Sequence, residues 1–136
     1  MASKLTEVAI DCADPHGLAR FWCSVLDYEV QDEDDGVVTI GPSSVPEGRD
    51  RPGHVPPALT FALVPERKTL KNRLHLDVNP TDREQDDEVR RLLDLGARHA
   101  DVGQGDESWV VLADPEGNEF CVETSAAERA ALSAPS

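Results

Sequence analysis

Apolar and polar residues alternate near the N-terminus, which predicts a half-buried strand over residues 4–12. A helix is expected over residues 15–27, because Asp14 suits its N-cap and Pro15 suits its first position. Apolar residues then recur at helical spacing, as one stripe that would face the core. The stripe comprises Leu18, Phe21, Trp22, Val25 and Leu26.

The first half of the chain continues with short strands and one long loop. Strands are predicted near residues 28–32 and 36–41, around an acidic Asp-Asp-Gly turn, and again over residues 58–64. Residues 42–57 contain five prolines, which predict a loop. This loop is too long for a simple connector, and its length is typical of loops that flank a binding cleft.

Alternation returns over residues 73–79 and predicts another strand. Its core-facing residues would be Leu74, Leu76 and Val78. Its opposite face would carry Arg73, His75 and Asp77. Such a face suits an anionic or hydrogen-bonding ligand, with a charged neighbour tuning the imidazole. A solvated surface row has the same pattern.

The second half then repeats the order of the first half. A helix is predicted over residues 82–95, ended by Gly96, and strands are predicted near residues 98–103, 108–113 and 118–124. Small residues dominate from 125 to 136 and predict a frayed C-terminal tail.

Each half thus contains one strand, one helix and three further strands. We expect an α+β fold in a single domain, residues 1–124. Its two βαβββ modules would cover residues 4–64 and 72–124.

The net charge of −14 narrows the choice of partner. A field of this sign repels phosphate, so nucleic acid and anionic membranes are poor partners, whereas cationic small molecules are attracted. Solubility alone would explain the same charge. The chain has no long apolar run, and Met1–Leu5 lack the apolar core of a signal peptide, so we expect a cytoplasmic protein without a membrane span. Three cysteines without CxxC spacing argue against a disulfide framework.

Four segments resemble the vicinal-oxygen-chelate superfamily, which includes glyoxalase I, extradiol dioxygenases and bleomycin-resistance proteins. They are Asp11-Cys12-Ala13-Asp14-Pro15, Phe21-Trp22, Lys71-Asn72-Arg73-Leu74-His75-Leu76-Asp77 and Asp114-Pro115-Glu116-Gly117-Asn118-Glu119-Phe120. Together these motifs are similar to those of the glyoxalase-like domain branch, and the resemblance covers residues 4–124. The resemblance implies a curved mixed sheet around a cleft shared by both modules, and a homodimer.

In metal-using members of this superfamily, the first and last strand of each half supply the ligands. The matching positions here are Glu7, His75 and Cys121, while the fourth strand offers only Thr60. The three residues could bind a soft ion such as zinc. Alternatively, Glu7 is a polar cleft residue and Cys121 is a small buried filler. We therefore expect no cofactor and no ion with four protein ligands; the alternative is a divalent ion, either zinc, nickel, manganese or iron.

Trp109 begins a predicted strand, and alternation leaves open whether it faces the helix or the cleft. Aromatic walls are typical of small-molecule pockets. The predicted ligand-binding residues are therefore Arg73, His75, Asp77 and Trp109. No catalytic residue is predicted.

Three functions fit these observations. The first is a small-molecule binding protein of bleomycin-resistance type, which sequesters its ligand without chemistry, and the incomplete ligand set favours it. The second is a metal-assisted lyase, isomerase or dioxygenase, favoured by His75 and Glu7. The third is a non-catalytic interaction module on the same scaffold. Only the second predicts that chelators abolish activity.

Overall fold

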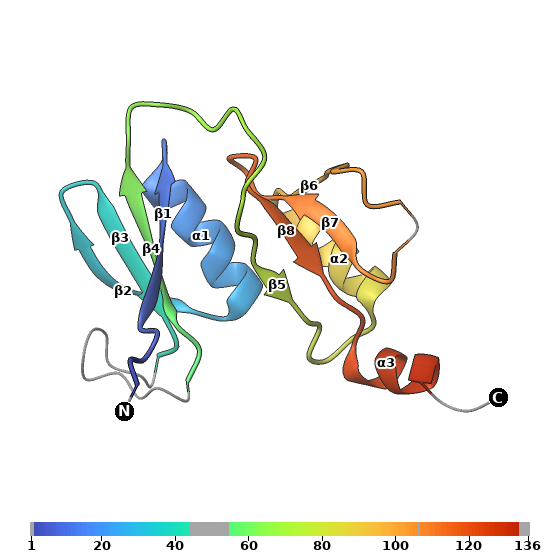
Figure 1. Cartoon of the computed structure of the whole chain (residues 1–136). Coiled ribbons are helices and arrows are strands. Elements are labelled where there is room, and N and C mark those ends of the chain that lie inside the picture. Colours follow the sequence, from blue (N-terminus) through green and yellow to red (C-terminus); the bar gives the residue numbers. More distant parts are fainter. Residues whose placement is uncertain (1, 44–54, 106, 134–136) are drawn as a thin grey trace. The chain divides into compact units, whose positions relative to one another are not determined.

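The computed structural model describes residues 2–43, 55–105 and 107–133. The chain divides into two compact units, Met1–Arg67 and Lys68–Ser136. Each unit contains a four-stranded mixed sheet with a helix beside it (Figure 1). The prediction of an α+β fold made of two βαβββ modules is confirmed. The placement of both sheets around one shared cleft stays a prediction.

The first unit has the strand order β1-β4-β3-β2. Strands β1 and β4 are parallel, and the other neighbours are antiparallel. Its elements are β1 (Glu7–Cys12), α1 (Pro15–Leu26), β2 (Glu29–Asp34), β3 (Val37–Gly41) and β4 (Ala58–Leu63). All five lie where the sequence pattern predicts them. Most of the predicted proline-rich loop, residues 44–54, lies outside the described residues.

Helix α1 begins where its capping residues predict. The Asp14 carboxylate accepts a hydrogen bond from the backbone N–H of Gly17 at 3.1 Å, and Pro15 occupies the first turn. A Cβ at position 17 would collide with the Asp14 carboxylate, so glycine permits this close cap. The start of the helix is therefore determined locally.

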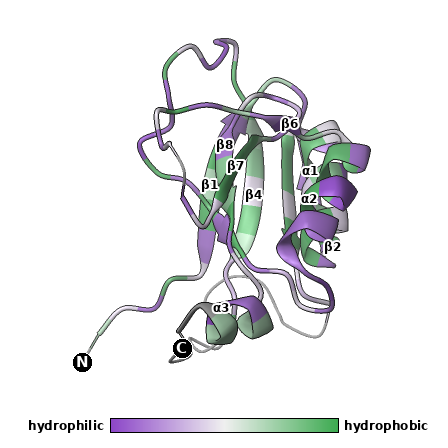
Figure 2. Cartoon of the chain, turned by 90° about the vertical axis from the view of Figure 1, so that its right-hand side faces the viewer, coloured by the Kyte–Doolittle hydropathy of each residue, from purple (hydrophilic) through white to green (hydrophobic). Residues whose placement is uncertain are grey.

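The core of the first unit lies between α1 and the sheet. Leu18, Phe21 and Trp22 of α1 are buried, while Val25 and Leu26 at its end are only half-buried. Helix α1 packs on β3 and β4. The ribbon of β4 is mostly hydrophobic (Figure 2). Phe21 and Trp22 add an edge-to-face pair with ring centroids 5.3 Å apart.

The second unit has the strand order β5-β8-β7-β6, again with one parallel pair, β5 and β8. Its elements are β5 (Asp77–Val78), α2 (Gln85–Leu95), β6 (Arg98–His99), β7 (Val110–Ala113), β8 (Glu119–Val122) and α3 (Ala126–Ser133). Its strands are shorter than predicted. Helix α2 buries Glu88, Val89 and Leu92, and most of its other residues are hydrophilic (Figure 2).

Strand β5 covers only two of the seven residues predicted for it. Leu74 is 87% exposed, so the prediction that it faces the core was wrong. Alternation assigns a side chain to a face only where the backbone pairs into a sheet, and pairing here starts at the Leu76 carbonyl, which accepts from the N–H of Cys121. Leu76 and Val78 are half-buried.

The predicted frayed tail is wrong for residues 126–133, which form α3. Ser125 and Glu128 make a capping box: the Ser125 Oγ accepts from the N–H of Glu128, and the Glu128 carboxylate accepts from the N–H of Ser125. The same carboxylate accepts from the N–H of Gln85, the first residue of α2, at 2.8 Å. Helix α2 thus starts at residue 85, three residues later than predicted, and α3 supplies its cap.

The turn between β7 and β8 is organised by one buried carboxylate. Asp114 is fully buried and accepts hydrogen bonds from the backbone N–H groups of Glu116 and Asn118, and from the Asn118 side chain. Gly117 has φ +87°, which favours glycine. Asp114 is therefore a turn residue.

All three cysteines are free. Within the described ranges, no helix combines the length and the hydrophobicity needed to cross a membrane.

Candidate functional site

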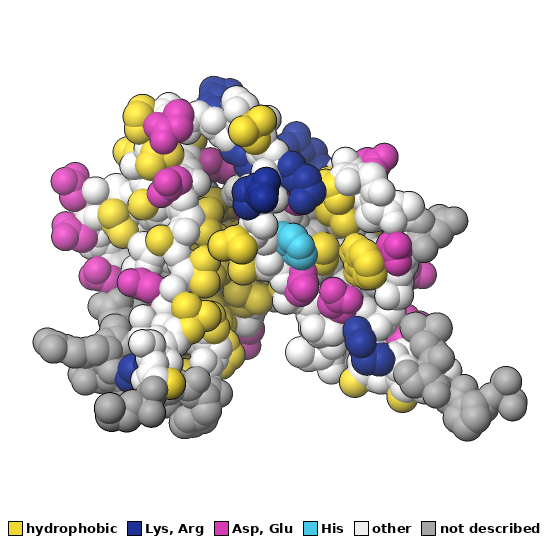
Figure 3. Space-filling model, viewed as in Figure 1, with side chains coloured by type: hydrophobic (Ala, Val, Ile, Leu, Met, Phe, Trp, Pro, Cys, Tyr) yellow, Lys and Arg dark blue, Asp and Glu magenta, His cyan; other side chains and the backbone are white. Residues whose placement is uncertain are grey.

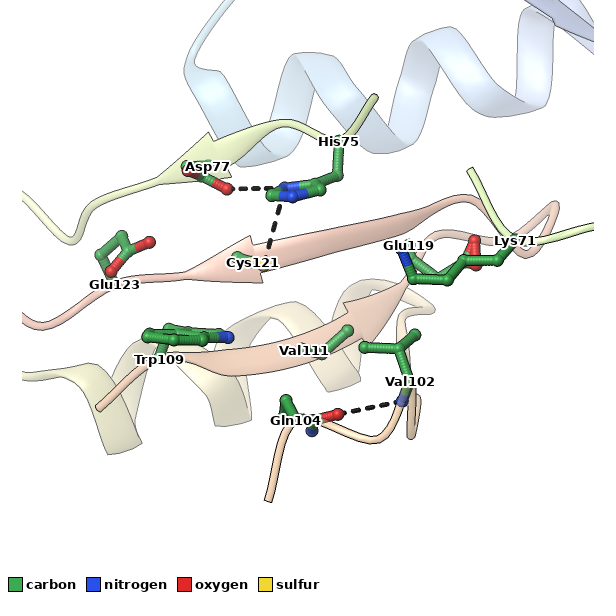
Figure 4. A pocket seen from close by; sticks show the side chains of 10 residues that line it. All are labelled: Lys71, His75, Asp77, Val102, Gln104, Trp109, Val111, Glu119, Cys121 and Glu123. Atoms are coloured by element: carbon green, nitrogen blue, oxygen red, sulfur yellow. Dashed lines mark hydrogen bonds and ion pairs between the residues drawn. The ribbon is translucent and has the colours of Figure 1, made fainter. Parts of the chain in front are cut away.

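The second unit contains a cavity of about 450 Å³ (Figure 4). Its size lies in the range of small-molecule sites. Both apolar and ionisable side chains line it: Lys71, His75, Asp77, Val102, Gln104, Trp109, Val111, Glu119, Cys121 and Glu123. Every lining residue in the described part of the chain belongs to the second unit.

Strand β8 supplies much of the polar wall because of its two-residue period. Glu119 and Cys121 lie on the cavity side with Glu123, which follows the strand, while Phe120 and Val122 are buried at 1% and 0% exposure. Trp109 and Val111 add an aromatic and an aliphatic side chain from the neighbouring chain segment of β7. Cys121 is paired directly with Asp77 of β5.

His75, Asp77 and Cys121 converge on one point of the cavity wall (Figure 4). The Nδ1 atom of His75 lies 2.9 Å from Oδ1 of Asp77 and 3.8 Å from Sγ of Cys121. The three potential ligand atoms all lie within 4.8 Å of one another. Nitrogen, oxygen and sulfur donors thus face one small volume.

Cys121 is held as a neutral thiol. Burial, the charge of Asp77, a hydrogen bond to Asp77 and the charge of Glu123 together raise its pKa to about 11, against an opposing effect of Lys71. A nucleophilic cysteine needs a depressed pKa. A catalytic triad also places its nucleophile and its carboxylate on opposite nitrogens of the histidine, whereas both partners here contact Nδ1. The arrangement does not suit nucleophilic catalysis.

The two ends of the cavity differ in charge. Lys71 and Glu119 lie at one end, and Trp109 and Glu123 lie at the other (Figure 4). Glu119 is neutralised by Lys68, whose Nζ lies 2.7 Å away. Burial raises the pKa of Glu119, but hydrogen bonds from Lys68 and from the backbone of Asn72 outweigh this effect and hold the pKa below its usual value.

Glu123 has a weaker partner. Its Oε2 lies 3.8 Å from Nη2 of Arg129, a largely exposed side chain. The carboxylates of Asp77 and Glu123 therefore give the cavity a negative character. On the face seen in Figure 3, acidic side chains are scattered widely, so the molecule's negative charge is not confined to this site.

The first unit carries an equivalent pair of positions. Glu7 pairs with Ala58 across β1 and β4, just as Asp77 pairs with Cys121 across β5 and β8. In these registers Thr60 lies two residues beyond the partner of Glu7, and Cys121 lies two residues beyond the position opposite His75. Thr60 and Glu7 therefore correspond to Cys121 and His75. The Thr60 hydroxyl donates to the Glu7 carboxylate at 2.6 Å and lies 3.0 Å from the Thr39 hydroxyl. This pair is polar but offers one carboxylate only.

Three of the four predicted ligand-binding residues line the cavity: His75, Asp77 and Trp109. Trp109 faces the cavity, which alternation alone left open. Arg73 is exposed and is not among the described residues that line it. The alternation that placed Arg73 beside His75 does not apply, because β5 begins only at Asp77. Its role in binding stays a prediction.

The predicted metal ligands fall into two groups. His75 and Cys121 are neighbours in the second unit, and Glu7 belongs to the first unit. Asp77, which the sequence predicted as a ligand-binding residue and not as a metal ligand, is the carboxylate that joins them. A set made of Glu7, His75 and Cys121 stays a prediction.

Sequence reasoning missed several residues of the site. Glu119 and Glu123 could have been found, since they alternate with buried residues around Cys121. Lys71, Val102 and Gln104 lie in segments without regular periodicity. No local signal identifies these three.

Comparison with known proteins agrees with this architecture. Residues 7–123 match the model of a family described as "glyoxalase-like domain". Comparison with curated proteins gave no match. The fold is similar to a glyoxalase/bleomycin resistance protein/dioxygenase family enzyme from Burkholderia phytofirmans PsJN, with 16% identity and a TM-score of 0.58, over 88% of this chain and 97% of that chain.

Two fosfomycin resistance proteins have similar folds. FosX from Mesorhizobium loti shares 13% identity at a TM-score of 0.64, over 95% of this chain and 98% of that chain. A variant of FosX from Listeria monocytogenes, complexed with Mn(II) and a dihydroxypropylphosphonic acid, shares 13% identity at a TM-score of 0.65, over 95% of both chains. These identities support the fold alone. Because the family model covers most of the chain, the protein belongs to the glyoxalase-like domain family of the vicinal-oxygen-chelate superfamily.

Proposed function

We propose that this protein binds and sequesters a small molecule in the cavity of its second unit. The observation that carries the proposal is the composition of the cavity wall. Val102, Trp109 and Val111 offer apolar surface, and ionisable groups converge opposite them. Small-molecule sites combine an apolar lining with a few placed polar groups in this way.

The charges of the cavity favour a ligand that carries a cationic group. Lys68 neutralises Glu119, which leaves Asp77 and Glu123 against Lys71. Trp109 lies at the same end of the cavity as Glu123 (Figure 4). An aromatic face beside a carboxylate suits an ammonium or guanidinium group. The net charge of −14 would also speed the approach of a cation.

Binding without chemistry fits the state of the cavity residues. Cys121 is a neutral thiol, with a pKa of about 11. Glu119 is engaged by Lys68 and by the backbone of Asn72. Neither group is activated toward a substrate, so we assign no catalytic residue among the described residues of the cavity.

The proposal can be tested by the fluorescence of Trp109. Matched aromatic probes that differ only in charge, such as phenethylammonium, 2-phenylethanol and phenylacetate, are titrated into the protein. We expect the cation to change the fluorescence most, and Trp109→Phe to remove the change. Trp22 is buried in the core of the first unit and serves as an internal constant.

Two variants sharpen this test. His75→Ala and Glu123→Gln should each weaken the cation about tenfold or more, which corresponds to about 1.4 kcal/mol. Asp94→Asn is the matched control, since Asp94 is exposed on α2 and does not line the cavity. Equal affinity for all three probes, or unchanged binding in both cavity variants, would contradict the proposal.

A second candidate function is a metal-assisted lyase, isomerase or dioxygenase. The observation that favours it is the convergence of His75, Asp77 and Cys121. A fold relative has been studied with Mn(II). A bound divalent ion would act as a Lewis acid toward substrate oxygens. Activity that chelators abolish and added metal restores would support this candidate over sequestration.

The superfamily resemblance also supports a homodimer, which we propose as the working form of the protein. Size-exclusion chromatography with light scattering tests this directly.

A further inference from the structure

We propose that the ligand of the cavity is an elongated zwitterion, with a cationic group at the Glu123 end and a carboxylate at the Lys71 end. The inference rests on the proposed function, because it names the class of molecule that the second unit would bind. Lys71 would be the residue that distinguishes such a zwitterion from a simple cation.

The Lys71 end of the cavity carries a surplus of positive charge. Glu119 lies at this end, but its carboxylate is engaged by Nζ of Lys68 at 2.7 Å and by the backbone N–H of Asn72 at 3.1 Å. The ammonium group of Lys71 donates a 3.3 Å hydrogen bond to the Asn72 carbonyl, and the described part of the chain provides it with no carboxylate partner. Lys71 is therefore the cation that remains to attract an anionic group.

The opposite end carries a surplus of negative charge. Glu123 and Trp109 lie there, and Asp77 lies between this end and His75 (Figure 4). Arg129 approaches Glu123 to 3.8 Å, but its side chain is 63% exposed, so solvent screens this ion pair. A cationic group of a ligand would meet two carboxylates and an aromatic face here.

The charges of both ends act inside the cavity. Cys121 lies between the two ends on β8, and the charge of Lys71 lowers the pKa of its thiol while the charge of Glu123 raises it. Solvent therefore does not fully screen either charge at the middle of the cavity. A ligand with the matching pair of charges would be oriented along the cavity by both ends.

The geometry of β8 sets the length of the ligand. Glu119 begins this strand and Glu123 follows its last residue, so the two lie four residues apart. An extended strand rises roughly 3.3 Å per residue, which places roughly 13 Å of backbone between the two ends. An extended tripeptide or tetrapeptide spans roughly 10–14 Å. We therefore expect an ω-amino acid or a short peptide of this length, whereas an α-amino acid is too short to reach both charges.

The test compares small probes of matched chain length by isothermal titration calorimetry. They are 8-aminooctanoate, octylamine and octanoate, with glycine as the short zwitterion. In the wild type we expect 8-aminooctanoate to bind about fivefold more tightly than octylamine, or better, which corresponds to about 1 kcal/mol. Octanoate and glycine should bind more weakly than either of them.

Two substitutions of Lys71 assign the effect to this side chain. Lys71→Met should remove the advantage of 8-aminooctanoate and strengthen the binding of octylamine, because a repulsive charge is lost. Lys71→Glu should make 1,8-diaminooctane the preferred probe, a gain that a misfolded variant cannot produce. Arg90→Met is the matched control: it removes the same charge from an exposed position on α2 outside the cavity, and should leave the order of the probes unchanged.

Three results would overturn the proposal. The first is equal affinity of octylamine and 8-aminooctanoate in the wild type. The second is an advantage of 8-aminooctanoate that survives in Lys71→Met or is lost equally in Arg90→Met. Both would leave the sequestration of a cation intact. The third is an absence of binding by every probe, and together with a silent fluorescence titration it would overturn the proposed function as well.

Discussion

Replacing Asp77 with Asn should make the Cys121 thiol of the metal-free protein more reactive. The pKa of Cys121 is raised to about 11, first by burial and then by the charge of Asp77 and a hydrogen bond to it. Removing the negative charge stabilises the thiolate relative to the thiol. The pKa should therefore fall, while burial still holds it above the ordinary value.

The size of the effect follows from the thiolate fraction. At pH 8 a thiol with a pKa of about 11 is roughly 0.1% ionised, whereas a thiol with an ordinary pKa of 9.0 is roughly 10% ionised. Alkylation by iodoacetamide should thus become severalfold faster in Asp77→Asn, with a ceiling of roughly 100-fold. In the wild type the alkylation rate should rise about tenfold for each unit of increase in pH, as long as the pH stays below the pKa.

The assay is peptide mapping of Cys121 alkylation by mass spectrometry, with chelator present. Comparing variant with wild type cancels the limited access of the reagent to a buried sulfur. Lys71→Met provides a control of opposite sign, because Lys71 lowers the pKa of Cys121 and its loss should slow the reaction. An Asp77→Asn variant that reacts no faster than wild type would refute the placement of this carboxylate beside the thiol.

Three further predictions concern stability and assembly. Glu119→Gln should destabilise the fold by about 1 kcal/mol at pH 7. Because the folded-state pKa of Glu119 is depressed, its contribution is present above the unfolded-state pKa and is lost as pH falls through the folded-state pKa. A difference in urea unfolding that does not decrease as the pH is lowered would contradict this. Asp114→Ala leaves the N–H groups of Glu116 and Asn118 without their acceptor, and thermal unfolding should report a loss of about 2–3 kcal/mol, whereas a loss below about 0.5 kcal/mol would argue against this account of the turn. Light scattering should give twice the chain mass, and a monomer at micromolar concentration would refute the dimer.

Local sequence signals located the first unit well. Helix α1 was predicted to within one residue, since its Asp14 cap, its proline and its apolar stripe all lie within the helix or next to it. The turn at Asp114 is equally local, because Glu116 and Asn118, which donate to its carboxylate, lie two and four residues further along the chain. The capping box of Ser125 and Glu128 was also readable, but the small residues around it were taken for a tail.

Non-local features were predicted less well. Leu74 was assigned to the core from alternation, and the sheet that would have covered it does not extend that far. The start of α2 depends on Glu128, which lies 43 residues away in the chain. A pattern of apolar residues does not predict where β5 begins or where α2 begins, because both depend on contacts with distant segments.

The candidate site shows the same division. The sequence by itself determined that His75 and Asp77 are near neighbours, because they lie two residues apart in the chain. The sequence also places Cys121 between the apolar residues Phe120 and Val122, both of which the structure buries. Only the tertiary structure decided that Cys121 lies 3.8 Å from His75, across 46 residues of chain. The parallel pairing of β5 with β8 brings them together, and that register is selected by the packing of the whole second unit.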